Sequence, residues 1–352
     1  MARRGFLLIN LGTPEDPGAP AVRRYLEEFL SDPRVIDINP WLRRALLHGV
    51  ILPFRSPQTA AAYKKIWTER GSPLLVHGQD LARKLAAVLG EDWHVELAMR
   101  YQNPSIDAAL GRFHEQGVQQ IVVFLLFPHY SSAAWGSAIE KLTVEARRRW
   151  PDPALTVVPP YYDHPVFIDA VAEVARPLLA DFEPDRVVLS YHGLPERQII
   201  KADASGDRHC LRSGGCCATL TAVNKDCYRA QCFATSRALA ARLGLAQHVC
   251  ETAFQSRMGR IPWIRPYTDE RVRALAQSGV RRLAVLSPAF TADCLETLEE
   301  IAIRAREDFI AHGGSELRLV PSLNSADVWV RAISAIAKEA ADKPTQHVQT
   351  AP

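Results

Sequence analysis

The sequence contains no uninterrupted apolar run of the ~18 residues that are needed to cross a bilayer. The apolar residues within the opening MARRGFLLINLG form a short run that continues directly into GTPEDPG. A run this short does not match a secretory signal peptide. We therefore expect a cytoplasmic protein whose first strand covers residues 6–10 and is followed by a loop at Gly12, Thr13 and Pro14.

The sequence also lacks a strong excess of charge of either sign. Its formal net charge is +3 over 352 residues, which argues against nucleic acid as the main partner. The hydrophobic content of 47% and the charged content of 23% are typical of a soluble globular enzyme. A chain of this length accommodates two domains of ordinary size or one large doubly wound unit.

Paired CxxC motifs are absent, although the chain has seven cysteines. Structural disulfides are rare in cytoplasmic proteins, so these cysteines are not expected to form a disulfide framework. Five of the seven lie between Cys210 and Cys232, with the spacing C-x5-CC-x9-C-x4-C. Such clustering indicates a local function for this segment.

Short apolar runs alternate with helical patterns along most of the chain, which predicts an α/β fold with parallel sheets. The chain also resembles itself: GVQQIVVFLLFPHY aligns with GVRRLAVLSPAF, and LLINLGTP aligns with VVLSYHGLP. We therefore predict two Rossmann-like halves, residues 1–160 and 161–340, that face each other across a cleft for a flat ligand. The polar residues 341–352 are predicted to form a disordered tail.

His192 follows the predicted buried strand 187–189 and precedes a turn that contains Gly193 and Pro195. It therefore lies at the carboxyl end of a strand, where open α/β sheets bind their ligands. The alternative is a turn histidine that makes a backbone hydrogen bond.

Asp293, Glu296 and Glu300 follow the second predicted strand of this half, residues 283–286, in a predicted acidic helix at 292–304. Their spacing of i, i+3, i+7 places three carboxylates on one helical face. A solvated helix face is the ordinary interpretation of such a pattern. An imidazole and several carboxylates at the same sheet edge would, however, also suit the passage of a cation.

Residues 40–54, PWLRRALLHGVILPF, form an apolar stretch with two arginines and flanking prolines. This pattern predicts either an amphipathic core helix or an exposed apolar lip. Such a lip would touch a membrane or admit a hydrophobic substrate.

Three longer motifs in this order, LSYHGLPER, FQSRMGRIPWIRPYTDE and DCLETLEEI, resemble those of the ferrochelatases. The similarity extends from LLINLGTP to Pro321–Asn324, and DCLETLEEI and ILPFRSP are closest to the proteobacterial branch. The resemblance implies a lyase with a chelatase-like fold that inserts Fe²⁺ into protoporphyrin IX, the last step of haem synthesis. It leaves open whether the protein is a monomer or a homodimer and whether it associates peripherally with the inner membrane. Cys294 stands where many relatives have histidine.

The resemblance also implies site residues. His192 matches the active-site histidine and Glu296 the carboxylate opposite it, while Asp293 and Glu300 match an acidic path for the metal. The positions that match residues near the porphyrin or its propionates are Leu11, Arg55, Tyr63, Arg100, Tyr101, Tyr130, Ser132, Ser256, Trp263 and Phe290. A porphyrin is flat, apolar on both faces and anionic at its propionates, so apolar walls with cationic and hydroxyl groups at the rim suit it.

Compared with much of this family, the chain carries about two dozen extra residues, at 202–227, and they include most of the clustered cysteines. Four thiolates on a glycine-rich loop suit a [2Fe–2S] cluster, which some ferrochelatases carry. A zinc site and free thiols are the alternatives. The expected ligands are Cys210, Cys216, Cys217 and Cys227, whereas Cys232, Cys250 and Cys294 are expected to be buried thiols.

Two other functions compete with this prediction. A chelatase of this type would use another tetrapyrrole or another metal. A protein that kept the fold and lost the chemistry would be a haem-binding or iron–sulfur sensor protein, but the presence of His192, Asp293 and Glu296 argues against that loss.

Overall fold

The computed structural model describes residues 4–150, 154–259 and 261–341. The chain divides into two compact units. Unit 1 comprises Met1–Phe127, Ser132–Pro159 and Asn324–Pro352, and unit 2 comprises Pro128–Ser131 and Pro160–Leu323. The tail predicted for 341–352 lies outside the described residues, apart from Ala341 at the end of helix α13.

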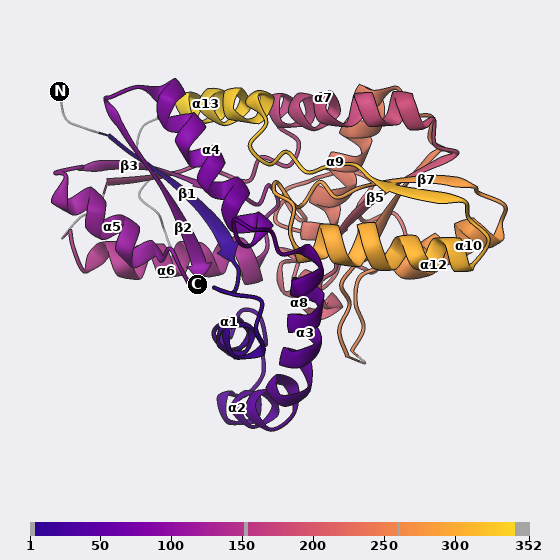
Figure 1. Cartoon of the computed structure of the whole chain (residues 1–352), viewed down its shortest axis with the longest axis horizontal. Helices are drawn as coiled ribbons and strands as arrows, with labels where there is room; N and C mark the ends of the chain where they lie inside the picture. The colour runs from indigo at the N-terminus through magenta and orange to yellow at the C-terminus, as the bar shows by residue number, and fades with distance from the viewer. Residues whose placement is uncertain (1–3, 151–153, 260, 342–352) are drawn as a thin grey trace. The chain divides into compact units, whose positions relative to one another are not determined.

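Unit 1 is built on a four-stranded parallel sheet in the order β2-β1-β3-β4. Its strands are β1 (Arg4–Gly12), β2 (Trp93–Tyr101), β3 (Gln120–Leu125) and β4 (Ala154–Val157). Helices α5 (Ile106–Glu115) and α6 (Ser137–Arg147) cover one face, and α4 (Pro73–Leu89) and α13 (Asp327–Ala341) lie on the other (Figure 1). Strands β1 and β3 are apolar and buried along most of their length, as expected for the centre of a parallel sheet.

Unit 2 repeats this arrangement, with a parallel sheet in the order β6-β5-β7-β8. Its strands are β5 (Arg186–His192), β6 (Cys250–Gln255), β7 (Arg282–Leu286) and β8 (Glu316–Leu319). Helices α7 (Pro165–Phe182) and α9 (Tyr228–Leu243) pack together, and α10 (Thr268–Gln277) packs with α12 (Arg306–Ala311). The matching strand order confirms the prediction of two Rossmann-like halves.

Helix α13 departs from the predicted division of the chain. The sequence assigns this helix to the second half, whereas the structure groups it with unit 1. Trp329 of α13 is fully buried and meets the ring of Phe124 edge-on at 5.9 Å, and Asp327 pairs with Lys84 at 2.7 Å. The last helix therefore completes the core of unit 1.

The longest excursions from the two sheets follow the equivalent central strands, β1 and β5. After β1 the chain forms α1 (Ala19–Ser31), α2 (Pro40–Leu46), the π-helix η1 (Leu47–Ile51) and α3 (Leu52–Ile66) before it reaches α4. After β5 it forms α8 (Glu196–Lys201) and the cysteine segment before it reaches α9. Both excursions begin at the carboxyl edge of a sheet, the edge at which α/β proteins bind ligands.

Candidate active site and cysteine segment

His192 is the last residue of β5, and its hydrogen bond determines which ring nitrogen is available. Its Nδ1 lies 2.6 Å from the carbonyl oxygen of Gly193. A carbonyl oxygen can only accept, so Nδ1 must carry the proton. In the neutral ring, Nε2 then has the lone pair that can accept a proton or bind a metal.

The backbone around His192 is tightly constrained. A Cβ atom at Gly193 would lie 2.8 Å from the carbonyl oxygen of Gln255, so a larger residue cannot be accommodated without a backbone shift. Gly193 N also donates to that same oxygen at 2.7 Å. These contacts hold the turn against the end of β6 and fix the direction in which the imidazole leaves the sheet.

Two aromatic side chains lie beside His192. The ring centroid of Trp263 is 6.5 Å from that of the imidazole, and the ring of Phe290 is 6.4 Å away. Trp263 is anchored because its Nε1 donates to the carbonyl oxygen of Met258 at 2.8 Å. Both aromatic residues were predicted substrate-binding residues, and the structure brings both to the histidine.

Glu300 lies on the π-helix η3 (Leu298–Ala305), where residues 255 and 256 at the end of β6 hold its carboxylate. Ser256 donates to it twice, from N at 2.8 Å and from Oγ at 2.5 Å, and Gln255 Nε2 lies 3.3 Å from Oε2. Ser256 has a φ of 66°, a left-handed conformation that turns its N–H toward the carboxylate. No pattern in the sequence had indicated a role for Gln255, although it lies within the FQSRMGR motif.

The expected single helical face of three carboxylates is wrong for Asp293. Helix α11 (Leu295–Thr297) begins after the N-cap Cys294, so Asp293 precedes the helix, and the π-helical geometry of η3 changes the spacing beyond it. Asp293 is buried, and its Oδ1 accepts from Thr297 Oγ1 at 3.0 Å. Glu296, on α11, is partly exposed.

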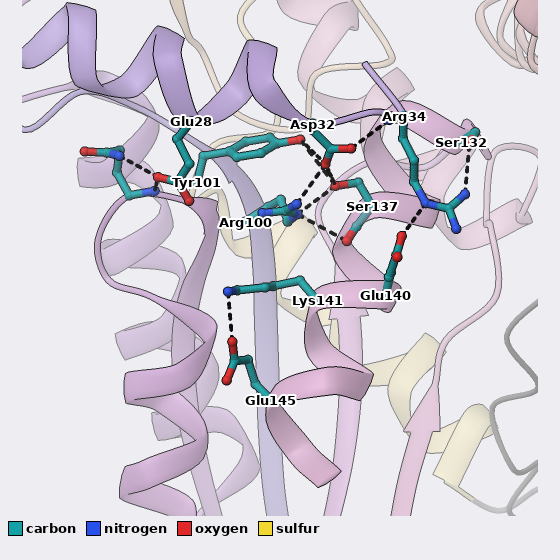
Figure 2. Close-up of polar contacts among 11 residues, drawn as sticks. Glu28, Asp32, Arg34, Arg100, Tyr101, Ser132, Ser137, Glu140, Lys141 and Glu145 are labelled. Atoms are coloured by element: carbon teal, nitrogen blue, oxygen red, sulfur yellow. Dashed lines mark hydrogen bonds and ion pairs between the residues drawn. The ribbon is translucent and has the colours of Figure 1, made fainter. Parts of the chain in front are cut away.

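Unit 1 contains a buried polar network centred on Asp32, shown in Figure 2. The carboxylate of Asp32 accepts from Arg100 Nη2 at 2.7 Å, Tyr101 Oη at 2.9 Å and Ser137 Oγ at 2.5 Å. It also accepts from Arg34 N at 2.7 Å. Burial alone would raise the pKa of Asp32, but the hydrogen bonds from Ser137 and from the backbone of Arg34 lower that pKa below its ordinary value.

This network changes the interpretation of two predicted substrate contacts. Tyr101 is 0% exposed and its hydroxyl is used by Asp32, so its side chain offers no surface to a substrate. Burial raises the pKa of Tyr101, which keeps the hydroxyl a donor. The guanidinium of Arg100 lies 4.3 Å from the Tyr101 ring centroid and is held by Asp32 and Ser137. Nothing in the sequence around Asp32 had indicated this role.

The other predicted substrate contacts are dispersed over several elements. Leu11 is half-buried at the end of β1, and Arg55 is half-buried on α3. Ser132 opens the π-helix η2 (Ser132–Gly136), where its Oγ accepts from Arg34 Nη1 at 3.1 Å. The backbone N–H of Tyr130 donates to Gln231 Oε1 at 2.7 Å.

The four predicted cluster ligands, Cys210, Cys216, Cys217 and Cys227, are all buried. The sulfur atoms of Cys216 and Cys217 are 3.7 Å apart. Two sulfurs on one tetrahedral metal at about 2.3 Å would lie roughly 3.8 Å apart. Burial raises the pKa of the Cys210 and Cys216 thiols.

Two side chains hold the cysteine segment in place. Asp203 accepts hydrogen bonds from Ser205 Oγ at 2.6 Å and from the backbone N–H groups of His209 and Cys210 at 2.9 and 2.8 Å. These bonds, led by that from Ser205, lower the pKa of Asp203. Asn224 donates to the carbonyl oxygen of Cys216 at 2.9 Å. The segment is therefore a structured loop in which individual cysteines have fixed backbone positions.

Across residues 4–150, 154–259 and 261–341, no group of three or more His, Cys, Asp or Glu side chains is arranged to hold a metal ion. Within the same ranges, no helix is both long and apolar enough to span a membrane.

The segment 40–54 exposes its apolar side chains. Trp41 is 79% exposed and Phe54 70% exposed, and Leu42, Leu46 and Val50 are also exposed, whereas Leu47 and Leu52 are buried. Figure 1 shows α2 at the tip of the α1–α3 excursion, away from the sheet of its own unit. The sequence predicted either an amphipathic core helix or an exposed apolar lip for this segment, and the structure shows the exposed lip.

Comparison with solved structures identifies the fold. SirB from Bacillus subtilis with Fe³⁺ aligns with a TM-score of 0.51 at 14% identity, over 97% of this chain and 96% of that one. CbiX, described as the terminal enzyme for siroheme biosynthesis in denitrifying bacteria, aligns with a TM-score of 0.50 at 12% identity, over 96% and 99%. The chain therefore has the two-sheet chelatase fold.

Sequence comparisons identify the family within this class. The ferrochelatase family model matches residues 3–341. A ferrochelatase of Coxiella burnetii is 45% identical over 335 residues, which are 95% of this chain and 93% of the relative. A ferrochelatase of Legionella pneumophila is 45% identical over 337 residues, 96% and 99% of the two chains. The chain belongs to the ferrochelatase family.

Proposed function

We infer that this protein is a protohaem-forming ferrochelatase, which inserts Fe²⁺ into protoporphyrin IX, and that His192 is its central base. The observation that supports this best is the fixed tautomer of His192 beside Trp263 and Phe290. Family membership supplies the reaction, and this geometry supplies a group with the required chemistry.

Insertion exchanges two pyrrole protons for one divalent cation. With Nδ1–H donated to Gly193, the Nε2 lone pair of His192 can accept a pyrrole proton as general base. It would release this proton to solvent before it accepts the second one. We propose that Trp263 and Phe290 provide apolar contact to the macrocycle beside that nitrogen. Glu296, at the start of the acidic segment that follows β7, would stabilise the imidazolium that forms.

The reaction can be tested by the anaerobic loss of protoporphyrin fluorescence after addition of Fe²⁺ to the native protein. Turnover supports the proposal. Turnover with coproporphyrin, or with nickel or cobalt, in preference to these substrates would favour a chelatase of different specificity. Porphyrin or haem binding without turnover would favour a binding protein.

Glu300 is proposed to receive the iron on its way to His192, and Ser256 to orient its carboxylate. Replacing Ser256 by alanine removes the 2.5 Å hydroxyl bond to Glu300 and leaves the backbone donor in place. A hydrogen bond to a charged group contributes about 1.5–3 kcal/mol, so KM for Fe²⁺ should rise about tenfold while KM for porphyrin stays unchanged.

Initial rates measured against Fe²⁺ concentration at saturating porphyrin check this prediction. Ser278→Ala is a matched control, because that hydroxyl donates to the carbonyl oxygen of Leu275 on α10. A rise in KM for porphyrin instead of iron would remove Ser256 and Glu300 from the metal path.

We propose that the four clustered thiols hold a [2Fe–2S] cluster. Their burial and the 3.7 Å separation of the Cys216 and Cys217 sulfurs support this proposal. The sulfurs also meet hydrogen-bond donors, since Leu211 N lies 3.4 Å from Cys216 Sγ and Arg229 Nη1 lies 3.0 Å from Cys217 Sγ. Donors of this kind tune iron–sulfur centres. Ligation requires the remaining sulfurs to close around the metals.

Replacing Cys217 by serine is expected to abolish iron and sulfide binding and the visible absorption of the cluster. Cys250→Ser is the matched control: this cysteine is partly buried on β6, outside the cysteine segment, and its replacement should leave iron and sulfide bound. Zinc without sulfide in the native protein would identify a zinc site, and the absence of any metal would identify free thiols.

We propose that the apolar lip at 40–54 contacts a membrane surface. Burial of one large apolar side chain contributes about 1.5–3 kcal/mol, so Trp41→Ser and Phe54→Ser should each weaken partitioning into phospholipid vesicles by about tenfold or more. Sedimentation with vesicles measures the effect. Val88→Ser removes an exposed apolar side chain from α4 and should bind as the native protein does. Equal partitioning of all variants would contradict the proposal.

A further inference from the structure

One side chain connects the cysteine segment with the segment that contains Trp263. Arg229 lies on α9, two residues after Cys227. Its Nη1 donates to Cys217 Sγ at 3.0 Å, while Nε and Nη2 lie 3.3 and 3.2 Å from the carbonyl oxygen of Arg265. The guanidinium also lies 4.7 Å from the ring centroid of Phe233. A planar group with fixed donors thus contacts a thiol and a backbone carbonyl at the same time.

The segment that receives these bonds, residues 262–265, is attached to the active-site turn. Ile264 N donates to the carbonyl oxygen of Leu194 at 3.0 Å, and Glu196 N donates to that of Pro262 at 3.0 Å. Leu194 and Glu196 follow His192 closely in the chain. Arg265 is only two residues after Trp263, whose ring lies 6.5 Å from the imidazole of His192. A displacement of the Arg265 carbonyl would therefore be transmitted to Trp263.

We infer that Arg229 is a positioning residue that couples occupancy of the cysteine site to the placement of Trp263. The inference rests on the cluster proposed above. Ligation of a cluster would hold the Cys217 sulfur as a thiolate, and a charged acceptor would strengthen the N–H···S bond from Arg229. Loss of the cluster would weaken that bond, and the donor pair that Arg229 presents to the Arg265 carbonyl would then be held less firmly.

Arg237 provides a matched control on the same helix. Its Nη1 donates to the backbone carbonyl oxygen of Cys217 at 3.2 Å, so it contacts the same cysteine without using the sulfur. If the coupling to Trp263 depends on the Cys217 sulfur and on Arg265, replacing Arg237 should leave the coupling intact. If any disturbance of the cysteine segment is enough to break the coupling, replacing Arg237 should have the same effect as replacing Arg229.

The test is ¹⁹F NMR of the full chain labelled with 5-fluorotryptophan, with the Trp263 resonance assigned from Trp263→Phe. The cluster is removed anaerobically with an iron chelator under reducing conditions. In the native protein and in Arg237→Met the Trp263 resonance should shift by more than its linewidth on removal. In Arg229→Met it should not respond. Arg229→Lys, which keeps the charge but lacks the planar fork, should match Arg229→Met.

Turnover gives a second readout. In Arg229→Met, KM for porphyrin should rise about fivefold, the lower end of ordinary coupling between sites, with kcat unchanged. The coupling would be overturned if the Trp263 resonance of the native protein did not shift on cluster removal, or if it still shifted in both Arg229 variants. Neither result would contradict the proposal that the cysteines hold a cluster. If the native protein contains neither iron nor sulfide, the cluster proposal fails and the coupling fails with it.

Discussion

His192→Ala is expected to bind protoporphyrin and to insert almost no iron. A positioned general base contributes about 10²–10⁴-fold, so kcat should fall by at least about 10²-fold. Porphyrin affinity should change little, because Trp263 and Phe290 remain in place to provide the proposed apolar contact. Anaerobic stopped-flow fluorescence, with iron in excess, separates binding from insertion.

Two variants complete this experiment. His192→Asn has an amide in place of the imidazole and cannot accept a proton at neutral pH, so it should be as inactive as the alanine variant. His248→Ala removes an exposed histidine after α9 and should turn over at the native rate. Native turnover in His192→Ala would leave the protein an enzyme but would assign the proton transfer to another group.

Asp32→Ala is expected to cause the largest loss of stability among the variants considered. It leaves the guanidinium of Arg100 largely buried without its carboxylate and removes the acceptor for Tyr101 and Ser137. Removing one partner of a buried ion pair typically costs about 3–5 kcal/mol. Urea unfolding followed by circular dichroism should show a lower midpoint. Glu140→Ala, which removes the exposed partner of Arg34 in the same region (Figure 2), should cost less than about 1 kcal/mol.

The same network predicts a pH dependence. The folded-state pKa of Asp32 lies below its ordinary value, so the carboxylate stabilises the fold at pH values above that ordinary value. This stabilisation should disappear as the pH falls through the depressed folded-state pKa. The stability difference between the native protein and Asp32→Ala should therefore shrink in acid. A difference that stays constant down to the acid transition would show that the charge of Asp32 contributes nothing.

The sheets could be predicted from the sequence because their central strands are buried on both faces. Runs such as 121–127 and 187–189 have no polar alternation. The internal similarity of the sequence predicted two Rossmann-like halves, and the structure adds that their strands follow the same order. The return of α13 to unit 1 could not be predicted, since an amphipathic helix does not specify which core it covers.

Only part of the candidate site could be predicted from the sequence. His192 was identified because a strand that ends in His-Gly specifies the sheet edge, and the structure adds the tautomer. Asp293 was misplaced because the helical spacing rule assumes an unbroken α-helix, and the π-helix η3 does not obey it. Gln255 and Asp32 act through partners more than forty residues away in the chain, and such contacts leave no local pattern.

The two long excursions leave their units at corresponding junctions, after β1 and after β5. The hydrogen bonds between the strands of each sheet do not involve residues of the excursions. The excursion after β1 bears the exposed apolar lip at 40–54, and the excursion after β5 bears the buried cysteines Cys210, Cys216, Cys217 and Cys227. Equivalent positions of two similar sheets thus present two chemically different segments. The excursion after β1 also carries Asp32, and the excursion after β5 is bonded through Arg229 to the segment that holds Trp263. Removing either excursion would therefore disturb the unit from which it leaves.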